Sequence, residues 1–383
     1  MSEPAAAPGP ARAIAYVVGA RPNFVKMAPV VRALQQRLPG WRHVVINTGQ
    51  HYDREMAEIF LEELGMPEPA YELGVGSGLH GAQTAKALAG IEEALLAERP
   101  AAVLVPGDVN STLAGALAAA KLGIPVGHVE SGLRSFDRTM PEELNRLVAD
   151  QLSDWLFTHS PEAFENLGRE GIPRERVFLV GNTMIDTLQA IRPRVEHSGI
   201  HAALGIEPGA YCLVTLHRPA LVDGPLLPDA LAALGRLAAA MPVVFPMHPR
   251  TRARLGEEAL AAALAAAPGL TVTGPVGYVD FLALELRARC VLTDSGGVQE
   301  ETTSLGVPCF TLRANTERPV TIAQGTNRLL GLDPGEIDRV PALLAEAEGR
   351  PVPPAPEGWD GRAAERLAEV LATDLEQRLA AAG

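Results

Sequence analysis

The sequence predicts an α/β protein built from two doubly wound domains. Short runs rich in β-branched residues alternate with longer Ala- and Leu-rich helical segments along most of the chain. The runs are almost continuously apolar, as are the strands of a parallel sheet that helices cover on both faces. With 383 residues, the chain is too long for one typical hydrophobic core and suits two domains of roughly 150–200 residues each.

The first series of elements begins close to the N-terminus. We expect strands at residues 14–18, 44–47, 102–105, 126–129, 156–159 and 177–180. Helical patterns separate them at residues 22–37, 80–98, 111–121 and 141–152. Sheets of this kind bind ligands at the carboxyl ends of their strands. Polar residues that directly follow these strands are therefore the candidates for a site.

A second series follows a linker near residues 181–199. We expect strands at residues 212–216, 243–246, 270–273, 290–293 and 309–312, and helices at 228–240, 252–267 and 279–287. A proline cluster ends this series, and a long amphipathic helix follows it. We predict a disordered tail at 1–12, an N-terminal domain at 13–182, a C-terminal domain at 183–360 and a helix at 361–383 that crosses back to the N-terminal domain.

Composition excludes several classes of partner. The formal net charge of −13, from 33 basic and 46 acidic side chains, argues against nucleic acid or an anionic membrane as a partner. No apolar run reaches the length of a membrane span, and the opening residues lack the pattern of a secretory signal. The 3 cysteines show no CxxC spacing and are expected to be reduced thiols. We predict a soluble cytoplasmic protein.

Basic residues follow the first predicted strand. Arg21 and Lys26 fall at the start of the next helix, where a phosphate is electrostatically favoured, although solvated cations at an ordinary turn are the alternative. A GxGxxG match at residues 76–81 lacks both the preceding strand and the following acidic residue of a dinucleotide site. We interpret it as a loop and a helix N-terminus.

Three carboxylates follow neighbouring strands of the first domain. Asp108, Glu130 and Glu142 each have an ordinary explanation: a helix cap, an ion pair with Arg134, and a favourable place in a first helical turn. If they converge, at least one pKa would rise, which suits acid–base chemistry.

The second domain offers anion-binding features. His217 and Arg218 follow one strand, as His248 and Arg250 follow another, and the first pair is a plausible diphosphate clamp. The strongest signal is Thr293-Asp294-Ser295-Gly296-Gly297, where small residues at a helix start let backbone N–H groups approach an anion. The acidic residues that follow would accept hydrogen bonds from sugar hydroxyls.

Together these motifs resemble the UDP-N-acetylglucosamine 2-epimerases. The resemblance is collinear from about residue 14 to 330 and is carried by Gly19-Ala20-Arg21-Pro22, His128-Val129-Glu130-Ser131-Gly132-Leu133-Arg134, Pro141-Glu142-Glu143, Asn145-Arg146, Gly181-Asn182-Thr183, His217-Arg218, Asp294-Ser295-Gly296-Gly297, Gln299-Glu300-Glu301 and Thr316-Glu317-Arg318-Pro319. It implies the GT-B architecture, two Rossmann-like domains facing a central cleft. It also implies that UDP is eliminated from the sugar and added back with the opposite configuration at carbon 2, through a 2-acetamidoglucal.

The resemblance assigns roles residue by residue. Asp108, Glu130, Glu142 and His217 match the catalytic positions. The substrate-binding positions are Arg21, Lys26, Arg146, Arg218, Phe281, Ser295, Gly296, Gly297, Glu301 and Arg318, with Glu301 at the ribose and Phe281 on the uracil side. The expected substrate is a UDP-N-acetylhexosamine. No DxD motif or metal-ligand cluster occurs, so we predict no metal and no cofactor, and we expect a homodimer.

Departures from the family pattern leave room for a modified sugar such as a uronate. Pro219-Ala220 follow His217-Arg218, and Val109-Asn110 follow Asp108, where many members differ. Three alternatives remain: a hydrolysing epimerase that releases ManNAc and UDP, a retaining GT-B glycosyltransferase, and a non-catalytic UDP-sugar sensor. The carboxylates and His217 weigh against the sensor.

Overall fold

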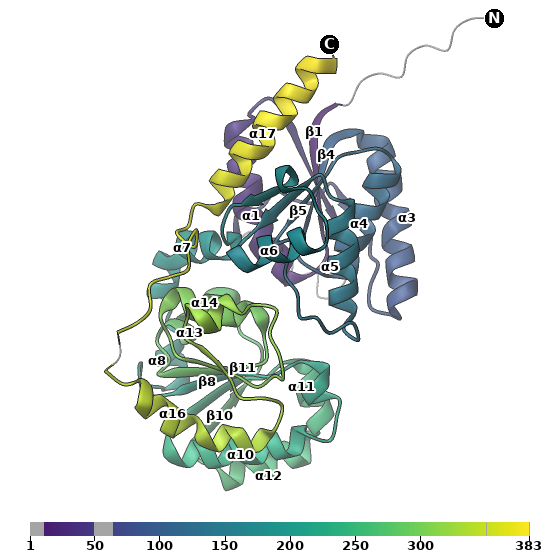
Figure 1. Cartoon of the computed structure of the whole chain (residues 1–383). Coiled ribbons are helices and arrows are strands. Elements are labelled where there is room, and N and C mark those ends of the chain that lie inside the picture. The colour runs from purple at the N-terminus through teal and green to yellow at the C-terminus, as the bar shows by residue number, and fades with distance from the viewer. Residues whose placement is uncertain (1–10, 50–63, 350, 383) are drawn as a thin grey trace, which may run out of the picture. The chain divides into compact units, whose positions relative to one another are not determined.

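The computed structural model describes residues 11–49, 64–349 and 351–382, and the chain divides into two units (Figure 1). One unit comprises Met1–Thr187 with Glu357–Gly383, and the other comprises Leu188–Pro356. Residues 1–10 of the predicted tail lie outside the described residues. The chain passes from one unit to the other inside helix α7, Thr183–Glu196.

The first unit is built on a parallel sheet of seven strands in the order β3-β2-β1-β4-β5-β6-β7. Its strands are β1 Ala11–Val18, β2 Arg42–Asn47, β3 Tyr71–Glu72, β4 Pro100–Pro106, β5 Val126–Val129, β6 Trp155–Thr158 and β7 Val177–Leu179. Its helices are α1 Arg21–Arg37, α3 His80–Glu98, α4 Asn110–Lys121, α5 Pro141–Leu152, α6 Pro161–Arg169, the start of α7, and α17 Ala363–Ala382, with a 3-10 turn at Arg174–Arg176.

The second unit contains a six-stranded parallel sheet in the order β10-β9-β8-β11-β12-β13. Its strands are β8 Cys212–Thr215, β9 Val243–Pro246, β10 Leu270–Thr273, β11 Cys290–Thr293, β12 Cys309–Thr311 and β13 Asn327–Leu329. Its helices are α8 Ile200–Leu204, α9 Pro219–Val222, α10 Leu227–Ala240, α11 Pro249–Leu255, α12 Glu257–Ala266, α13 Tyr278–Leu286, α14 Gly296–Leu305, α15 Val320–Ala323 and α16 Val340–Ala347, with a 3-10 helix at Pro334–Arg339.

Aliphatic packing fixes the helices on both sheets. Every residue of β4 is buried, as expected for a central parallel strand. Helix α4 lies close to this strand because Gly115 faces the sheet, where a Cβ atom would meet Val105 at 2.9 Å and Val17 at 3.2 Å. This close packing fixes the start of α4, and with it the loop that carries Asp108.

The structure differs from the sequence prediction in a few elements. The helix expected at residues 252–267 is two helices, α11 and α12, because Gly256 between them has a left-handed φ of 77°. Helix α7 forms within the predicted linker, and helix α6 and the short strands β3 and β13 were not expected. Strands of two or three residues carry too little periodicity to be recognised in a sequence.

The strand orders place a switch point in each sheet. Connections run in opposite directions on either side of the β1–β4 pair and of the β8–β11 pair. The loops after neighbouring strands therefore diverge there and leave a crevice at the carboxyl ends, which is where doubly wound sheets bind ligands. The segments after β1, β4, β8 and β11 are the places to look for a site.

Helix α17 belongs to the first unit, although the whole second unit precedes it in the sequence. It packs against α1 (Figure 1). Asp186 in α7 accepts hydrogen bonds from the N–H groups of Ala363 and Ala364 at 3.1 and 2.7 Å and so caps α17. The Trp359 indole donates to the carbonyl of His159 at 2.9 Å.

Among the residues that the structure describes, no helix is both long enough and apolar enough to cross a membrane.

Candidate active site

The loops after β1 and β4 are joined by one buried amide. The Asn23 side chain accepts hydrogen bonds from the backbone N–H groups of Gly19 and Ala20 at 3.1 and 3.2 Å and donates to the carbonyl of Pro106 at 3.3 Å. Arg21 begins α1 beside it and is exposed. The switch point of the first sheet is therefore held together by residues of the sequence motif that begins at Gly19.

Lys26 and Glu130 form a buried ion pair at this switch point. Each side chain is 7% exposed. Gly107 packs over the pair, since a Cβ atom there would lie 3.1 Å from the Lys26 ammonium nitrogen. Glu130 has a φ of 69°, a left-handed conformation that costs free energy in a residue other than glycine and tends to occur at functional sites. Lys26, predicted to bind phosphate, pairs with the Glu130 carboxylate in this structure.

Asp108 is the end of a second charge network. The buried guanidinium of Arg146 donates to one carboxylate oxygen of Asp108 at 2.6 and 3.1 Å, and to Glu143 at 2.6 Å. Glu143 also accepts bonds from the N–H groups of Ser135 and Phe136, both at 2.9 Å. Arg146, predicted to bind substrate, is thus the residue that orients Asp108.

Glu142 lies outside this network. It precedes Glu143 on α5 and is half-buried, whereas Glu143 is buried and holds Arg146. The Pro141-Glu142-Glu143 motif therefore contains two carboxylates with different surroundings. The one that forms an ion pair with Arg146 is Glu143.

A buried cluster supports the loop that contains Glu130. The His128 ring lies between the Asp150 carboxylate, 2.6 Å from Nδ1, and the carbonyl of Gly107, 2.7 Å from Nε2. Arg134 donates to Asp150 at 2.6 Å and to Glu170 at 2.6 Å, so Arg134 does not pair with Glu130. Although burial opposes ionisation of Asp150, the charges and hydrogen bonds of His128 and Arg134 hold its pKa below the usual range.

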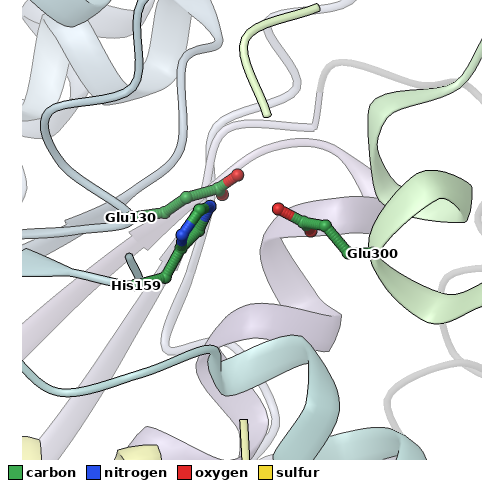
Figure 2. Close-up of side chains that lie close together, drawn as sticks. All are labelled: Glu130, His159 and Glu300. Carbon is green, nitrogen blue, oxygen red and sulfur yellow. The ribbon is translucent and has the colours of Figure 1, made fainter. Parts of the chain in front are cut away.

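His159 is a residue that the sequence reasoning missed. It follows β6, is 2% exposed, and one of its ring nitrogens lies within 4.8 Å of a carboxylate oxygen of Glu130. Figure 2 shows Glu130 and His159 side by side at the ends of neighbouring strands; Glu300, also drawn, belongs to the second unit. The available signal was its position, at the end of the predicted strand next to the one that Glu130 follows.

In the second unit, Asp294 orients the His217–Arg218 segment. One oxygen of Asp294 accepts bonds from the backbone N–H groups of His217 and Arg218 at 2.8 and 2.7 Å, and the other lies 3.2 Å from His217 Nδ1. Because these residues follow β8 and β11, the contact closes the switch point of the second sheet. The His217 side chain is 39% exposed, and the His248 ring lies beside it at 6.1 Å between centroids.

Arginine side chains gather at the start of α14. Arg318 donates to Glu300 at 2.7 Å and lies 2.8 Å from Glu317, which also pairs with Arg218 at 3.3 Å. Gly296 is needed under Arg318, since a Cβ atom there would meet its guanidinium at 2.4 Å. Ser295, Gly296 and Gly297 begin the helix, where backbone N–H groups lack intrahelical acceptors. Cationic groups and helix donors thus meet at one point.

Glu301 lies one residue beyond Glu300 and faces α13. Tyr278 donates to it at 2.7 Å. Burial raises the pKa of Glu301 to about 7, against the lowering effect of the bonds from Tyr278 and from Glu285. Phe281, predicted on the uracil side, is partly buried and packs on the apolar cluster beneath α13. The GxGxxG match leads into α3 at His80, as a loop and a helix N-terminus.

The two sheets and their switch-point residues define a class of protein. Each unit has the strand order of a Rossmann-like fold, and charged side chains lie at the carboxyl edge of each sheet. A solved lipopolysaccharide outer core galactosyltransferase shares the fold, with a TM-score of 0.53 at 14% identity over 94% of this chain and 99% of that one. The predicted α/β class with two Rossmann-like domains of the GT-B type is confirmed.

The chain belongs to the UDP-N-acetylglucosamine 2-epimerase family, whose model matches residues 32–372. It is 45% identical over 324 residues to a UDP-N-acetylglucosamine 2-epimerase of Methanocaldococcus jannaschii, covering 83% of this chain and 88% of that protein. A crystal structure of the UDP-GlcNAc 2-epimerase of that organism, in complex with UDP-GlcNAc and UDP, matches with a TM-score of 0.84, 41% identity and coverage of 94% and 99%. The chain is therefore an enzyme of an isomerase family.

A second relative is named for a reaction on a different sugar nucleotide. The UDP-2,3-diacetamido-2,3-dideoxy-D-glucuronate 2-epimerase of Pseudomonas aeruginosa is 40% identical over 366 residues, which cover 94% of this chain and 99% of that protein. The predicted family is confirmed, and the two relatives differ in the substituents of the sugar.

Proposed function

We propose that this enzyme epimerises carbon 2 of a UDP-N-acetylhexosamine by eliminating UDP and adding it back. The observation that carries the proposal is the pair of carboxylates at the carboxyl edge of the first sheet. Asp108 and Glu130 follow the adjacent strands β4 and β5, and each is oriented by a cation, Arg146 or Lys26. The relatives named as UDP-N-acetylglucosamine 2-epimerases support the same reaction.

The reaction requires both negatively charged side chains near the sugar and positively charged groups near the diphosphate. In the forward elimination the bond between carbon 1 and the UDP oxygen breaks, a base takes the proton from carbon 2, and a carbon 1–carbon 2 double bond forms. Re-addition returns UDP to carbon 1 and a proton to the opposite face of carbon 2. The leaving diphosphate gains negative charge, which Arg318, Arg218 and the α14 N-terminus would stabilise.

We assign the removal of the carbon 2 proton and its return to two different carboxylates. Removal and return occur on opposite faces of carbon 2, so two groups are needed, and Asp108 and Glu130 are the candidates. His217, oriented by Asp294, would assist the departure of UDP. Glu142 remains a proposed contact to the sugar.

A hydrolysing outcome would use the same elimination. Water would then take the place of UDP in the addition to carbon 1, and the products would be ManNAc and UDP. The relative that acts on a diacetamido-glucuronate makes a uronate the specific alternative for the sugar.

Product analysis distinguishes these outcomes. The purified enzyme is incubated separately with UDP-GlcNAc and with UDP-2,3-diacetamido-2,3-dideoxy-glucuronate, and the products are followed by proton and phosphorus NMR. We expect the C2 epimer of one substrate with its diphosphate linkage intact. Free ManNAc and UDP as the only products would establish the hydrolysing reaction. No conversion of either substrate would contradict the proposal.

A further inference from the structure

Glu285 is a buried acid for which the reaction has no obvious use. It lies on α13 with none of its surface exposed. Within the described part of the chain, no N–H or O–H group donates a hydrogen bond to either of its carboxyl oxygens. A carboxylate in that position would be unpaired and desolvated, which is very costly. The neutral acid is the form that this environment accepts, and a neutral carboxyl group is itself a donor.

The polar partner of Glu285 is Glu301. The two carboxyl groups approach each other between α13 and α14, so a protonated Glu285 has the Glu301 carboxylate as its acceptor. Tyr278 lies seven residues before Glu285, two turns along the same face of α13, and donates to Glu301 from there. Helix α13 therefore presents two O–H donors to one carboxylate.

We infer that Glu285 is a positioning residue for Glu301: it stays protonated and donates a hydrogen bond to Glu301, whose ionised form accepts hydrogen bonds from the ribose hydroxyls of the nucleotide. This inference rests on the proposed function, in which Glu301 contacts the ribose. A cis-diol donates two hydrogen bonds, and an ionised carboxylate accepts them better than a neutral acid does. Glu285 would then set the pH range in which the enzyme distinguishes a ribonucleotide.

The neighbouring charged and titratable groups agree with this assignment. Glu300, beside Glu301 on α14, is paired with Arg318. Cys309 on β12 is buried, and burial raises the pKa of its thiol to about 12, so it adds no charge near neutral pH. Burial and the charge of Glu301 both raise the pKa of Glu285 well above the usual range. Above about pH 7, one negative charge, on Glu301, remains for the pair.

Ribose discrimination provides the test. Binding of UDP and of 2′,3′-dideoxy-UDP is measured by calorimetry between about pH 6 and pH 9, and the ratio of the two affinities cancels the titration of the diphosphate. We expect the wild type to prefer UDP. Glu285→Leu should lower this preference about tenfold near pH 7, since it loses one charge-assisted bond, and should regain it as the pH rises. Glu285→Gln, whose amide donates the same bond, should keep the wild-type preference.

The outcomes separate the two proposals. A Glu285→Leu enzyme with wild-type preference at every pH would overturn the role of Glu285 and leave the epimerase proposal standing. A wild type that binds both nucleotides equally would overturn the ribose role of Glu301 and with it this inference. A wild type that binds neither would count against the proposed function itself.

A spectroscopic measurement covers the case in which Glu285→Leu does not fold. Infrared spectra of the wild type near neutral pH should contain the carbonyl band of a neutral, hydrogen-bonded carboxyl group that is missing in Glu285→Gln. Identical spectra in the carboxylic acid region would show that Glu285 carries no proton and would contradict the inference.

Discussion

Glu130 shows how a single residue can store conformational free energy for function. Its φ of 69° would be comfortable for glycine, and here it costs roughly 1 kcal/mol or more. The ion pair with Lys26 and the His128–Asp150 bond beside it hold this conformation. Asp108 reaches its position differently, through two hydrogen bonds from Arg146 to one of its carboxylate oxygens. Each carboxylate is thus fixed before substrate binds.

Removing either carboxylate charge should stop proton transfer and spare nucleotide binding. We expect Asp108→Asn and Glu130→Gln to lower turnover by about 10²–10⁴-fold, the usual contribution of a general acid or base. UDP affinity should stay within a few-fold of wild type, because the proposed diphosphate contacts come from Arg218, Arg318 and α14. Turnover is followed by NMR and UDP binding by calorimetry.

The matched control for these two variants is Glu92→Gln, an exposed carboxylate on α3. It should leave both quantities unchanged. Wild-type turnover in Asp108→Asn or in Glu130→Gln would refute the role assigned to that residue.

At the scale of elements, the chain passes between the units inside α7 and again a few residues before α17 begins. Asp186 in α7 caps α17, so one carboxyl group ties the two elements together. Asp186 is 6% exposed, and burial raises its pKa to about 6, above the ordinary 3.8, despite the two backbone donors. As the pH rises from about 4 to 6, the unfolded chain loses this proton first, so the contribution to stability falls and then stays level above pH 6.

Asp186→Asn should therefore change stability in a pH-dependent way. The amide stays neutral, so the free energy of unfolding of the variant relative to wild type should improve by about 2 kcal/mol between pH 4 and pH 7. A constant offset from the lost cap bond is expected in addition. Urea unfolding is followed by tryptophan fluorescence, because all 3 tryptophans, Trp41, Trp155 and Trp359, lie in the unit that contains α17.

The exposed Glu93→Gln on α3 serves as the control and should show no change in relative stability with pH. If the difference between Asp186→Asn and wild type is the same at both pH values, Asp186 ionises as it would in the unfolded chain, and the account of this cap is wrong.

The long elements were predictable because their patterns are long and regular. Strong apolar runs and helix periodicity locate β1, β4 and α3 closely, and Gly-rich strand ends mark the loops that carry Arg21 and Gly296. Side-chain partners were not predictable, because they depend on how elements pack. The Glu143–Arg146 pair, the Lys26–Glu130 pair and the acid at Glu285 arise from contacts that no local spacing encodes.

At the scale of the whole molecule, the net charge of −13 opposes binding of an anionic nucleotide. Screening limits this repulsion to about 8 Å at physiological ionic strength, so local groups decide affinity. Arg218, Arg313 and Arg318 lie close to buried carboxylates in the second unit. Burial, together with the charges of the other two arginines, lowers the pKa of Arg313. The acidity of the chain is thus compatible with a local anion site.

Incorporation of solvent hydrogen at carbon 2 tests the central claim most directly. The enzyme is incubated in deuterated water with UDP-GlcNAc, and in parallel with the diacetamido-glucuronate nucleotide, and both epimers are examined by proton NMR and mass spectrometry. Because the proton returned to carbon 2 comes through protein carboxyl groups that exchange with solvent, the product epimer should carry one deuterium at carbon 2. Epimer formed without deuterium at carbon 2 would contradict proton exchange by these carboxylates, and the absence of any epimer or label with either substrate would contradict the proposed reaction.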